Sequence, residues 1–256
     1  MAHDRSTFEG RRTFLKAAAG GLFGAAAAPL AAFAQGAAKE GAGGAPLKIA
    51  TIGAGREGGA LGTLFAKRGH PVMFSSRHPE QLKELVASAG PNAQAGTVDE
   101  AVKFADVVLL VVPYGAVEEI GRDHGKALAA KKLVLDVSNP IARRDGEEIV
   151  KRVEQKGGAG LATASMLPGA RLVRAFNAIG SAGLTQAASG QGTPVGVPIA
   201  GDDPEAIALA SSLVRELGLE PVLVGGLAMG KYLVPGTPLG GEHSPDEIRR
   251  IAATLK

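Results

Sequence analysis

The sequence feature that points most clearly to a chemical function is a glycine motif that follows a short apolar run. Residues 47–77 read LKIATIGAGREGGALGTLFAKRGHPVMFSSR. The pattern G-x-G-x-x-G is made by Gly53, Ala54, Gly55, Arg56, Glu57 and Gly58. In such a motif the first glycine permits a tight turn, the second lets the backbone approach a pyrophosphate, and the third lets a helix pack closely on a strand. The motif predicts a dinucleotide-binding site.

The flanking sequence supplies the elements that such a site needs. Residues 47–52 are an apolar run typical of a strand, and residues 72–75 are a second one. Between them Leu61, Leu64 and Phe65 recur on one face of an expected helix, whose N-terminal N–H groups would face the phosphates. Strand, glycines, helix and strand thus come in the order of a nucleotide-binding unit. An ordinary strand-to-helix turn is the alternative.

The end of the second apolar run indicates which dinucleotide binds. An NAD site needs an acidic residue about 20 positions after the glycines, but Ser76 and Arg77 stand there and the next carboxylate is Glu80. A guanidinium forms charge-assisted hydrogen bonds with a phosphate and can stack on adenine, and Arg56 would add a second cation. We therefore expect NADP(H), with a solvated Arg77 as the alternative.

The N-terminal segment has the features of a targeting signal. RRTFLK at residues 11–16 precedes an uncharged stretch rich in Ala and Gly, which ends in Ala-Phe-Ala at residue 34. This is the order of a signal peptide, and it resembles the twin-arginine type, with Gly10 where Ser is more usual. We expect a twin-arginine signal peptide over residues 1–34, cleaved after Ala34. The precursor would use the twin-arginine export machinery, and the product would be periplasmic or otherwise exported.

A membrane anchor over residues 17–38 is the alternative to cleavage. The stretch reaches the roughly 20 residues that a spanning helix needs, but Ala, Gly, Pro29 and Gln35 make it a poor lipid anchor. Stable membrane insertion is accordingly not expected. Residues 35–46, QGAAKEGAGGAP, read as a flexible linker.

Composition excludes several other classes of protein. The chain has 28 Lys and Arg against 25 Asp and Glu, and without residues 1–34 the counts become 24 and 23. Nothing in that balance favours nucleic acid or a membrane surface as a partner. The absence of Cys excludes disulfides, thiolate nucleophiles and zinc–cysteine sites, and no metal site is expected.

Beyond the glycine motif, apolar runs continue to alternate with helical patterns. Thr97 to Glu100 is a capping-box pattern, and the continuous runs at 106–112 and 133–137 are typical of parallel strands buried on both faces. We expect a doubly wound parallel sheet, the Rossmann fold, over residues 47–192. A smaller α/β unit over residues 193–256 would add the strand 195–200, the helix 202–217, the strand 221–224 and a short helix at 228–233.

Ligands of doubly wound sheets lie beyond the carboxyl ends of the strands. Three expected strand ends carry suggestive residues. Val112, Pro113 and Tyr114 follow one, Asn139 follows the next, and Asn177 follows the third. The prolines would fix tight turns and the asparagines could orient an amide, so the sequence predicts that these residues share a pocket. The alternative is that these residues only form turns between the elements, as Asn and Pro commonly do.

Taken together, the segments IGAGREGGALGTLFAKRGH, SSRHPE, ADVVLLVVPYGAV, LDVSNP, LVRAFNAIG and GDDPEAIALASSLVRELGLEPVLVGGL resemble the NADP-dependent oxidoreductases that use coenzyme F420, a deazaflavin. The resemblance spans residues 47–235. It implies NADP contacts at residues 54–57, 2′-phosphate contacts at Ser76 and Arg77, and nicotinamide contacts at residues 112–114. Where the family has a further basic residue that contacts the phosphate, this chain has Gln81, so the side chain for that contact is absent here.

The resemblance implies hydride transfer between NADP(H) and a small-molecule redox acceptor, either coenzyme F420 or a flavin. Such transfer needs two stacked rings rather than a strong acid or base. Tyr114 is the one titratable residue that we expect near the rings, as a proton donor or as a packing surface. Related domains serve in ferric reductases, so a ferric-chelate reductase is an alternative. An exported protein that binds NADP(H) without turnover is another. The sequence leaves open whether the protein forms a homodimer.

Overall fold

The computed structural model describes residues 46–190 and 194–255. The predicted signal peptide, with its cleavage site, and all but the last residue of the predicted linker lie outside the described residues.

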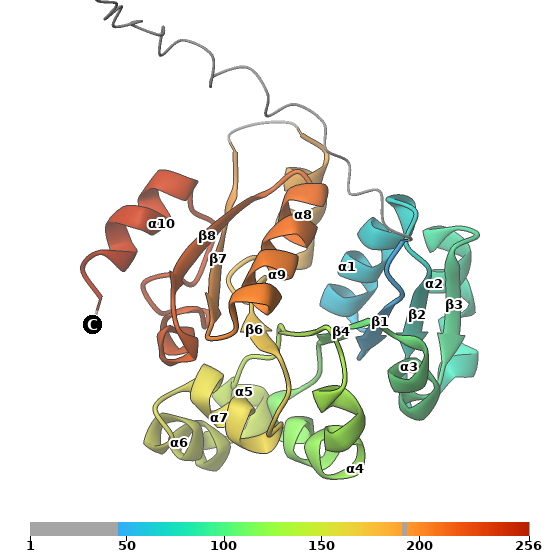
Figure 1. Cartoon of the computed structure of the whole chain (residues 1–256), viewed down its shortest axis with the longest axis horizontal. Coiled ribbons are helices and arrows are strands. Elements are labelled where there is room, and N and C mark those ends of the chain that lie inside the picture. Colours follow the sequence, from blue (N-terminus) through green and yellow to red (C-terminus); the bar gives the residue numbers. More distant parts are fainter. Residues whose placement is uncertain (1–45, 191–193, 256) are drawn as a thin grey trace, which may run out of the picture. The chain divides into compact units, whose positions relative to one another are not determined.

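The described chain is built on one eight-stranded sheet, whose strand order is β3-β2-β1-β4-β5-β6-β7-β8 (Figure 1). All neighbouring strands are parallel except β6 and β7, which are antiparallel. The predicted Rossmann-like α/β fold is confirmed. The strands are β1 (Ile49–Ile52), β2 (Val72–Ser75), β3 (Ala93–Gly96), β4 (Val107–Leu110), β5 (Leu133–Asp136), β6 (Leu172–Arg174), β7 (Gly196–Gly201) and β8 (Glu220–Gly225).

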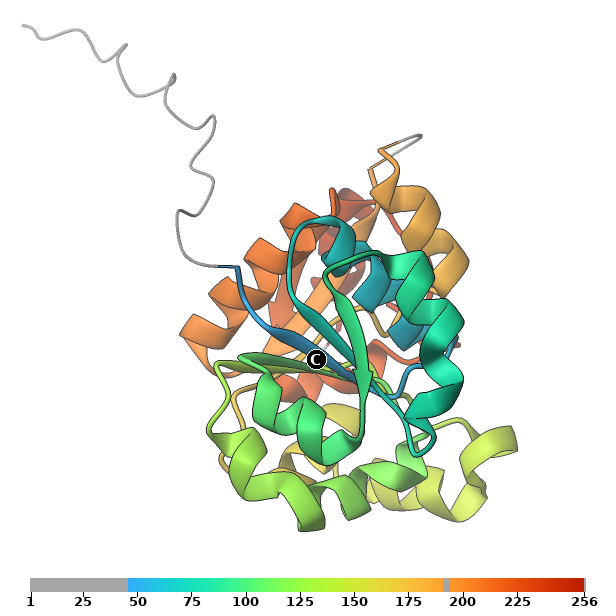
Figure 2. The ribbon, with the colours of Figure 1, turned by 90° about the vertical axis from the view of Figure 1, so that its right-hand side faces the viewer.

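Helices cover both faces of this sheet, as Figures 1 and 2 show. One face is packed by residues of α1, α2, α8 and α9, and the other by residues of α3, α4, α6 and α7. The helices are α1 (Arg56–Lys67), α2 (Lys83–Ala89), α3 (Val98–Phe104), α4 (Val117–Ala129), α5 (Ala142–Asp145), α6 (Glu147–Gln155), α7 (Ala159–Met166), α8 (Ser181–Ala188), α9 (Pro204–Glu216) and α10 (Pro245–Ala252). Short 3₁₀ turns are η1 (Pro79–Leu82), η2 (Tyr114–Ala116) and η3 (Leu227–Tyr232).

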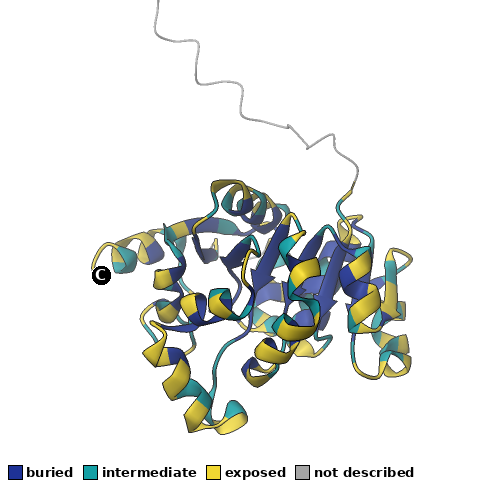
Figure 3. Ribbon diagram, turned by 60° about the horizontal axis from the view of Figure 1, so that its bottom comes forward, coloured by how far each residue is buried: buried dark blue, intermediate teal, exposed yellow. Residues whose placement is uncertain are grey.

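The central strands are apolar throughout because both of their faces are covered. Every residue of β4 is buried. Val107 and Leu109 pack on one side of the sheet, and Val108 and Leu110 pack on the other. Figure 3 shows this buried layer between helices whose outer faces are exposed. A run without polar alternation is the pattern expected for such strands.

The C-terminal elements that the sequence predicts are present, and they extend the same sheet. Asp203 caps α9 by accepting hydrogen bonds from the backbone N–H groups of Glu205 and Ala206, with Pro204 at the first helical position. The strand β7 runs antiparallel to β6, so the direction of the sheet reverses at this point. The proposed boundary near residue 192 stays a prediction. No helix in the two described ranges combines the length and apolarity needed to cross a bilayer.

Candidate functional site

The glycine motif forms a tight turn between β1 and α1. Gly53 has a φ of +99°, and a Cβ there would overlap the carbonyl oxygen of Val111. A Cβ on Gly58 would overlap the carbonyl oxygen of Gly53. At Gly55, by contrast, no atom lies within 4 Å of the Cβ position. Gly53 and Gly58 thus close the turn, and Gly55 leaves open space in which a ligand could approach the backbone.

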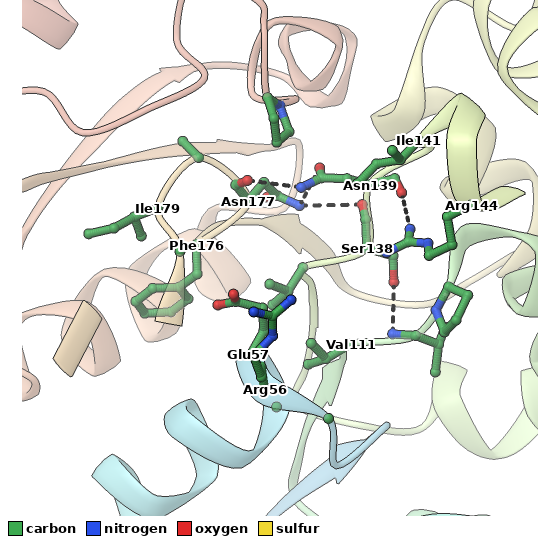
Figure 4. Close-up of a pocket in the computed structure, with 18 of the residues that line it drawn as sticks. Arg56, Glu57, Val111, Ser138, Asn139, Ile141, Arg144, Phe176, Asn177 and Ile179 are labelled. Carbon is green, nitrogen blue, oxygen red and sulfur yellow. Dashed lines mark hydrogen bonds between the residues drawn. The ribbon is translucent and has the colours of Figure 1, made fainter. Parts of the chain in front are cut away.

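The open side of this turn faces the N-terminus of α1. Gly55 is the N-cap residue, and no side chain caps the helix. The first N–H groups of α1 and the positive end of its dipole are therefore available to an anion. A cavity of about 460 Å³ lies against Gly55, Arg56, Glu57 and Gly58 (Figure 4). Its volume falls in the range usual for small-molecule and cofactor sites.

Most of the remaining lining comes from the segments that follow β4, β5 and β6, and Pro235, after η3, adds to it. These strands are neighbours in the sheet and run parallel, so their carboxyl ends meet at one edge, where ligands of such sheets bind. The lining residues from these segments are Val111, Val112 and Pro113 after β4, Val137, Ser138, Asn139, Ile141, Arg143 and Arg144 after β5, and Phe176, Asn177, Ala178, Ile179 and Gly180 after β6.

The structure brings Asn139 and Asn177 together, as the sequence predicts. Asn139 Nδ2 donates to the carbonyl oxygen of Asn177 at 2.9 Å. The side chain of Asn177 lies across the end of β5, where its Nδ2 donates to the carbonyl oxygen of Asp136 at 3.0 Å. Phe176, just before it, is buried with a φ of +64°, a conformation that is rare for a bulky residue. The chain thus turns sharply at Phe176, which directs Asn177 toward the cavity.

A buried ion pair, which the sequence analysis missed, supports Asn139 directly and Asn177 through Asn139. The guanidinium of Arg174 donates to the carboxylate of Asp136, and both side chains are fully buried. Arg174 also donates to the carbonyl oxygen of Ser138 and to Asn139 Oδ1, each at 3.0 Å. The two charges end neighbouring apolar strands in register. The sequence does show that a charged residue ends each of these two apolar runs. It does not show that the two residues pair, because that depends on the order of the strands in the sheet.

Ser76 and Arg77 lie outside the cavity but on the same edge of the sheet. Ser75 pairs in register with Ile52, the residue before Gly53, so the end of β2 lies beside the glycine turn. Ser76 is half-buried and Arg77 is exposed. Within the described residues, no hydrogen bond or ion pair engages the guanidinium of Arg77 or of Arg56. Two cations beside an open turn fit the pyrophosphate and the 2′-phosphate of NADP(H).

Tyr114 is not in the position that the sequence analysis expected. Val112 and Pro113 line the cavity, but the side chain of Tyr114 turns into the core, where only 2% of the residue is exposed. Its hydroxyl lies 3.1 Å from the carbonyl oxygen of Ala159 and 3.0 Å from Thr163 Oγ1, both on α7. Burial raises the pKa of Tyr114 to about 12. The prediction that its side chain contacts the reacting rings, or carries a proton, is wrong for this structure.

Comparisons with known proteins agree with this geometry. Residues 48–140 match the model of the family described as NADP oxidoreductase, coenzyme F420-dependent. The chain is 30% identical to Metalloreductase STEAP3 of Rattus norvegicus over 178 residues, which cover 67% of this chain and 32% of that protein. The chain thus spans about a third of the length of this curated relative.

Two solved structures share the fold. A hypothetical protein, SMa0349 of Sinorhizobium meliloti, superposes with a TM-score of 0.61 at 26% identity, covering 77% of this chain and 93% of that one. A protein of Arthrobacter sp. FB24, described as a "putative f420 dependent nadp-reductase", superposes with a TM-score of 0.61 at 18% identity, covering 72% of this chain and 87% of that one. The segment that matches the model of the coenzyme F420-dependent NADP oxidoreductases, residues 48–140, holds the glycine turn and the ends of β2, β4 and β5.

Proposed function

We propose that this protein is an NADP(H)-dependent oxidoreductase that transfers a hydride between NADP(H) and a flavin or deazaflavin acceptor such as coenzyme F420. One observation carries the proposal. A single cavity joins the uncapped N-terminus of α1 to the ends of β4, β5 and β6. The glycine turn and the ends of β4 and β5, which form part of its lining, lie in the segment that matches the NADP oxidoreductase family.

Each wall of the site has a separate task in binding. The N–H groups at the start of α1, with Arg56, would hold the pyrophosphate, and Ser76 with Arg77 would hold the 2′-phosphate. Val112 and Pro113 would form the apolar side against which the nicotinamide lies. When bound, NADP(H) supplies the hydride.

The other lining residues would exclude water and fix the orientation of the acceptor. Phe176 and Ile179 make the cavity partly apolar. Arg174 of the buried ion pair holds Asn139, and Asn139 in turn holds the backbone of Asn177. Orientation of two rings in a dry site is the main contribution that a protein makes to such a transfer. Tyr114 has no role as an acid or a base in this proposal.

A direct test is to mix the purified protein with NADPH and follow the loss of its absorbance with each of several acceptors. Coenzyme F420, FMN, riboflavin and ferric chelates form the panel. The proposal expects oxidation of NADPH that depends on a flavin or deazaflavin. Turnover with ferric chelates alone would favour a ferric-chelate reductase, which the similarity to a metalloreductase makes the second candidate. Tight binding without any turnover would favour a binding protein.

We further propose that the protein is exported in folded form by the twin-arginine machinery. The support is the RRTFLK sequence at residues 11–16 and the Ala-Phe-Ala site before residue 35. Because this machinery carries folded proteins, a tightly bound cofactor could be loaded before export.

A further inference from the structure

Two residues that line the cavity, Glu57 and Asn177, each carry a buried hydrogen-bond acceptor without a partner in the described protein, on a side chain that is fixed at its other polar atom. Glu57 Oε1 accepts a hydrogen bond from the backbone N–H of Ser181 at 2.9 Å, but Glu57 Oε2 is buried without a partner. Asn177 Nδ2 is held by the carbonyl oxygen of Asp136, but Asn177 Oδ1 is buried without a partner. We call Glu57 Oε2 and Asn177 Oδ1 the acceptor pair.

Both side chains are held in place by structure that lies outside the cavity. The N–H of Ser181 belongs to the first turn of α8, whose dipole favours a carboxylate at that point. The Asn177 amide is held at the end of β5, beside the buried ion pair. Neither side chain needs a ligand to become ordered. The hydrogen bonds that fix the two side chains are therefore already made before anything binds.

The walls of the cavity restrict what the acceptor pair can meet. Glu57 lines the cavity from the first turn of α1, and Asn177 lines it from the segment after β6, as Figure 4 shows. A buried acceptor without a hydrogen bond is unfavourable, so the pair favours a ligand group that brings hydrogen-bond donors. A ligand with only acceptors at this point would be disfavoured.

This inference rests on the proposed function, because it concerns how the same cavity recognises NADP(H). The acceptor pair shares the cavity with Val112 and Pro113, the proposed nicotinamide wall. At that end of the dinucleotide, the carboxamide is the group that offers two N–H donors from one nitrogen. We propose that Glu57 and Asn177 are specificity-determining residues that accept the N–H hydrogen bonds of the nicotinamide carboxamide.

The test compares NADP⁺ with its 3-acetylpyridine analogue, in which a methyl group replaces the amide nitrogen. Both ligands carry the same phosphates, ribose hydroxyls and ring charge, so the ratio of their dissociation constants isolates the two N–H donors. Calorimetric titration in the absence of any acceptor measures both constants without turnover. We expect NADP⁺ to bind the wild-type protein about tenfold more tightly than the analogue, a difference of about 1.4 kcal/mol.

The variant Glu57→Gln sharpens the test. The substituted side chain keeps an oxygen for the Ser181 N–H but places an NH₂ group, which cannot accept, where Oε2 was. We expect weaker binding of NADP⁺ and a change of less than about twofold for the analogue, so that the preference largely disappears. Glu148→Gln, an exposed glutamate in the first turn of α6 that does not line the cavity, is the matched control and should keep the wild-type preference.

The outcomes separate this inference from the proposed function. Equal affinities of the wild-type protein for the two ligands would overturn the carboxamide assignment while leaving an NADP(H) site intact. A preference that survives Glu57→Gln would overturn the role of Glu57. Failure of the wild-type protein to bind either ligand would contradict the proposed function itself. The wild-type comparison decides the question even if the variant does not fold.

Discussion

Asp136 and Arg174 form a fully buried ion pair between β5 and β6, and they stand opposite each other in the register of the two strands. The pair is joined to the lining of the cavity, because Arg174 also donates hydrogen bonds to the Ser138 carbonyl group and the Asn139 side chain. One carboxylate and one guanidinium thus connect the interior of the sheet to the loops that line the proposed site.

Loss of one partner of this pair should destabilise the fold strongly. Arg174→Met leaves the Asp136 carboxylate buried without its counter-charge, and removal of one partner from a buried pair costs about 3–5 kcal/mol. Urea unfolding at neutral pH would measure the change in the free energy of unfolding. Arg249→Met, which removes two exposed ion pairs, with Asp246 on α10 and with Glu220 on β8, is the control and should cost far less. Similar losses in the two variants would contradict the structural role of Arg174.

The glycine turn gives a paired prediction, because its glycines differ in what surrounds them. Gly58→Ala would force a Cβ onto the carbonyl oxygen of Gly53 and should lower stability and cofactor affinity together. Gly55→Ala places its Cβ in open space, so the melting temperature should stay close to the wild-type value. NADP⁺ should nevertheless bind less tightly to Gly55→Ala, because the new methyl group occupies space left for the pyrophosphate. Unchanged affinity in Gly55→Ala would place the phosphates elsewhere.

Part of the fold could be predicted because its signals are local. The glycine turn, the capping box at Thr97 and the buried run at β4 follow from neighbouring residues, and all three are present. The strand β3 was missed because Ala-Gln-Ala-Gly at the edge of the sheet is short and largely exposed, without branched residues. The helix α7 was missed because its sequence, AGLATASM, shows no polar face.

The side chains of the site were harder to predict than its elements. The sequence placed Val112, Pro113, Asn139 and Asn177 at strand ends, and the fold brings them to one cavity. Tyr114 follows the same strand, but the 3₁₀ turn that it begins directs its ring to α7 instead. The direction in which a side chain points after a turn depends on tertiary packing, which no local sequence pattern encodes.

Tyr114 should make the protein less stable at high pH. Burial raises its pKa to about 12 in the folded state, whereas an unfolded tyrosine has a pKa of about 10. The unfolded state thus releases its proton first, and the free energy of unfolding falls as the pH rises from about 10 to about 12. Tyr114→Phe should show a shallower decline of stability with pH than the wild type, measured by denaturation at several pH values. Equal slopes would contradict the burial of this phenol.

Export can be tested independently of the cofactor. Changing Arg11 and Arg12 together to Lys should leave the precursor inside the cell, because the twin-arginine machinery requires the arginine pair. Cell fractionation would follow the protein, and N-terminal sequencing of the exported form should begin at Gln35. An uncleaved N-terminus on membrane-bound protein would instead favour the anchor.

The central claim, an NADP(H) site at the glycine turn and the end of β2, is tested most directly by calorimetric titration of the protein with NADPH and with NADH. Ser76 and Arg77 stand where an NAD site has a carboxylate, so NADPH should bind at least about tenfold more tightly, a difference of about 1.4 kcal/mol. Arg77→Asp should remove or reverse that preference, whereas Arg215→Asp, on the exposed surface of α9, should keep it. Equal affinity of the wild-type protein for the two cofactors, or no binding of either, would contradict the account.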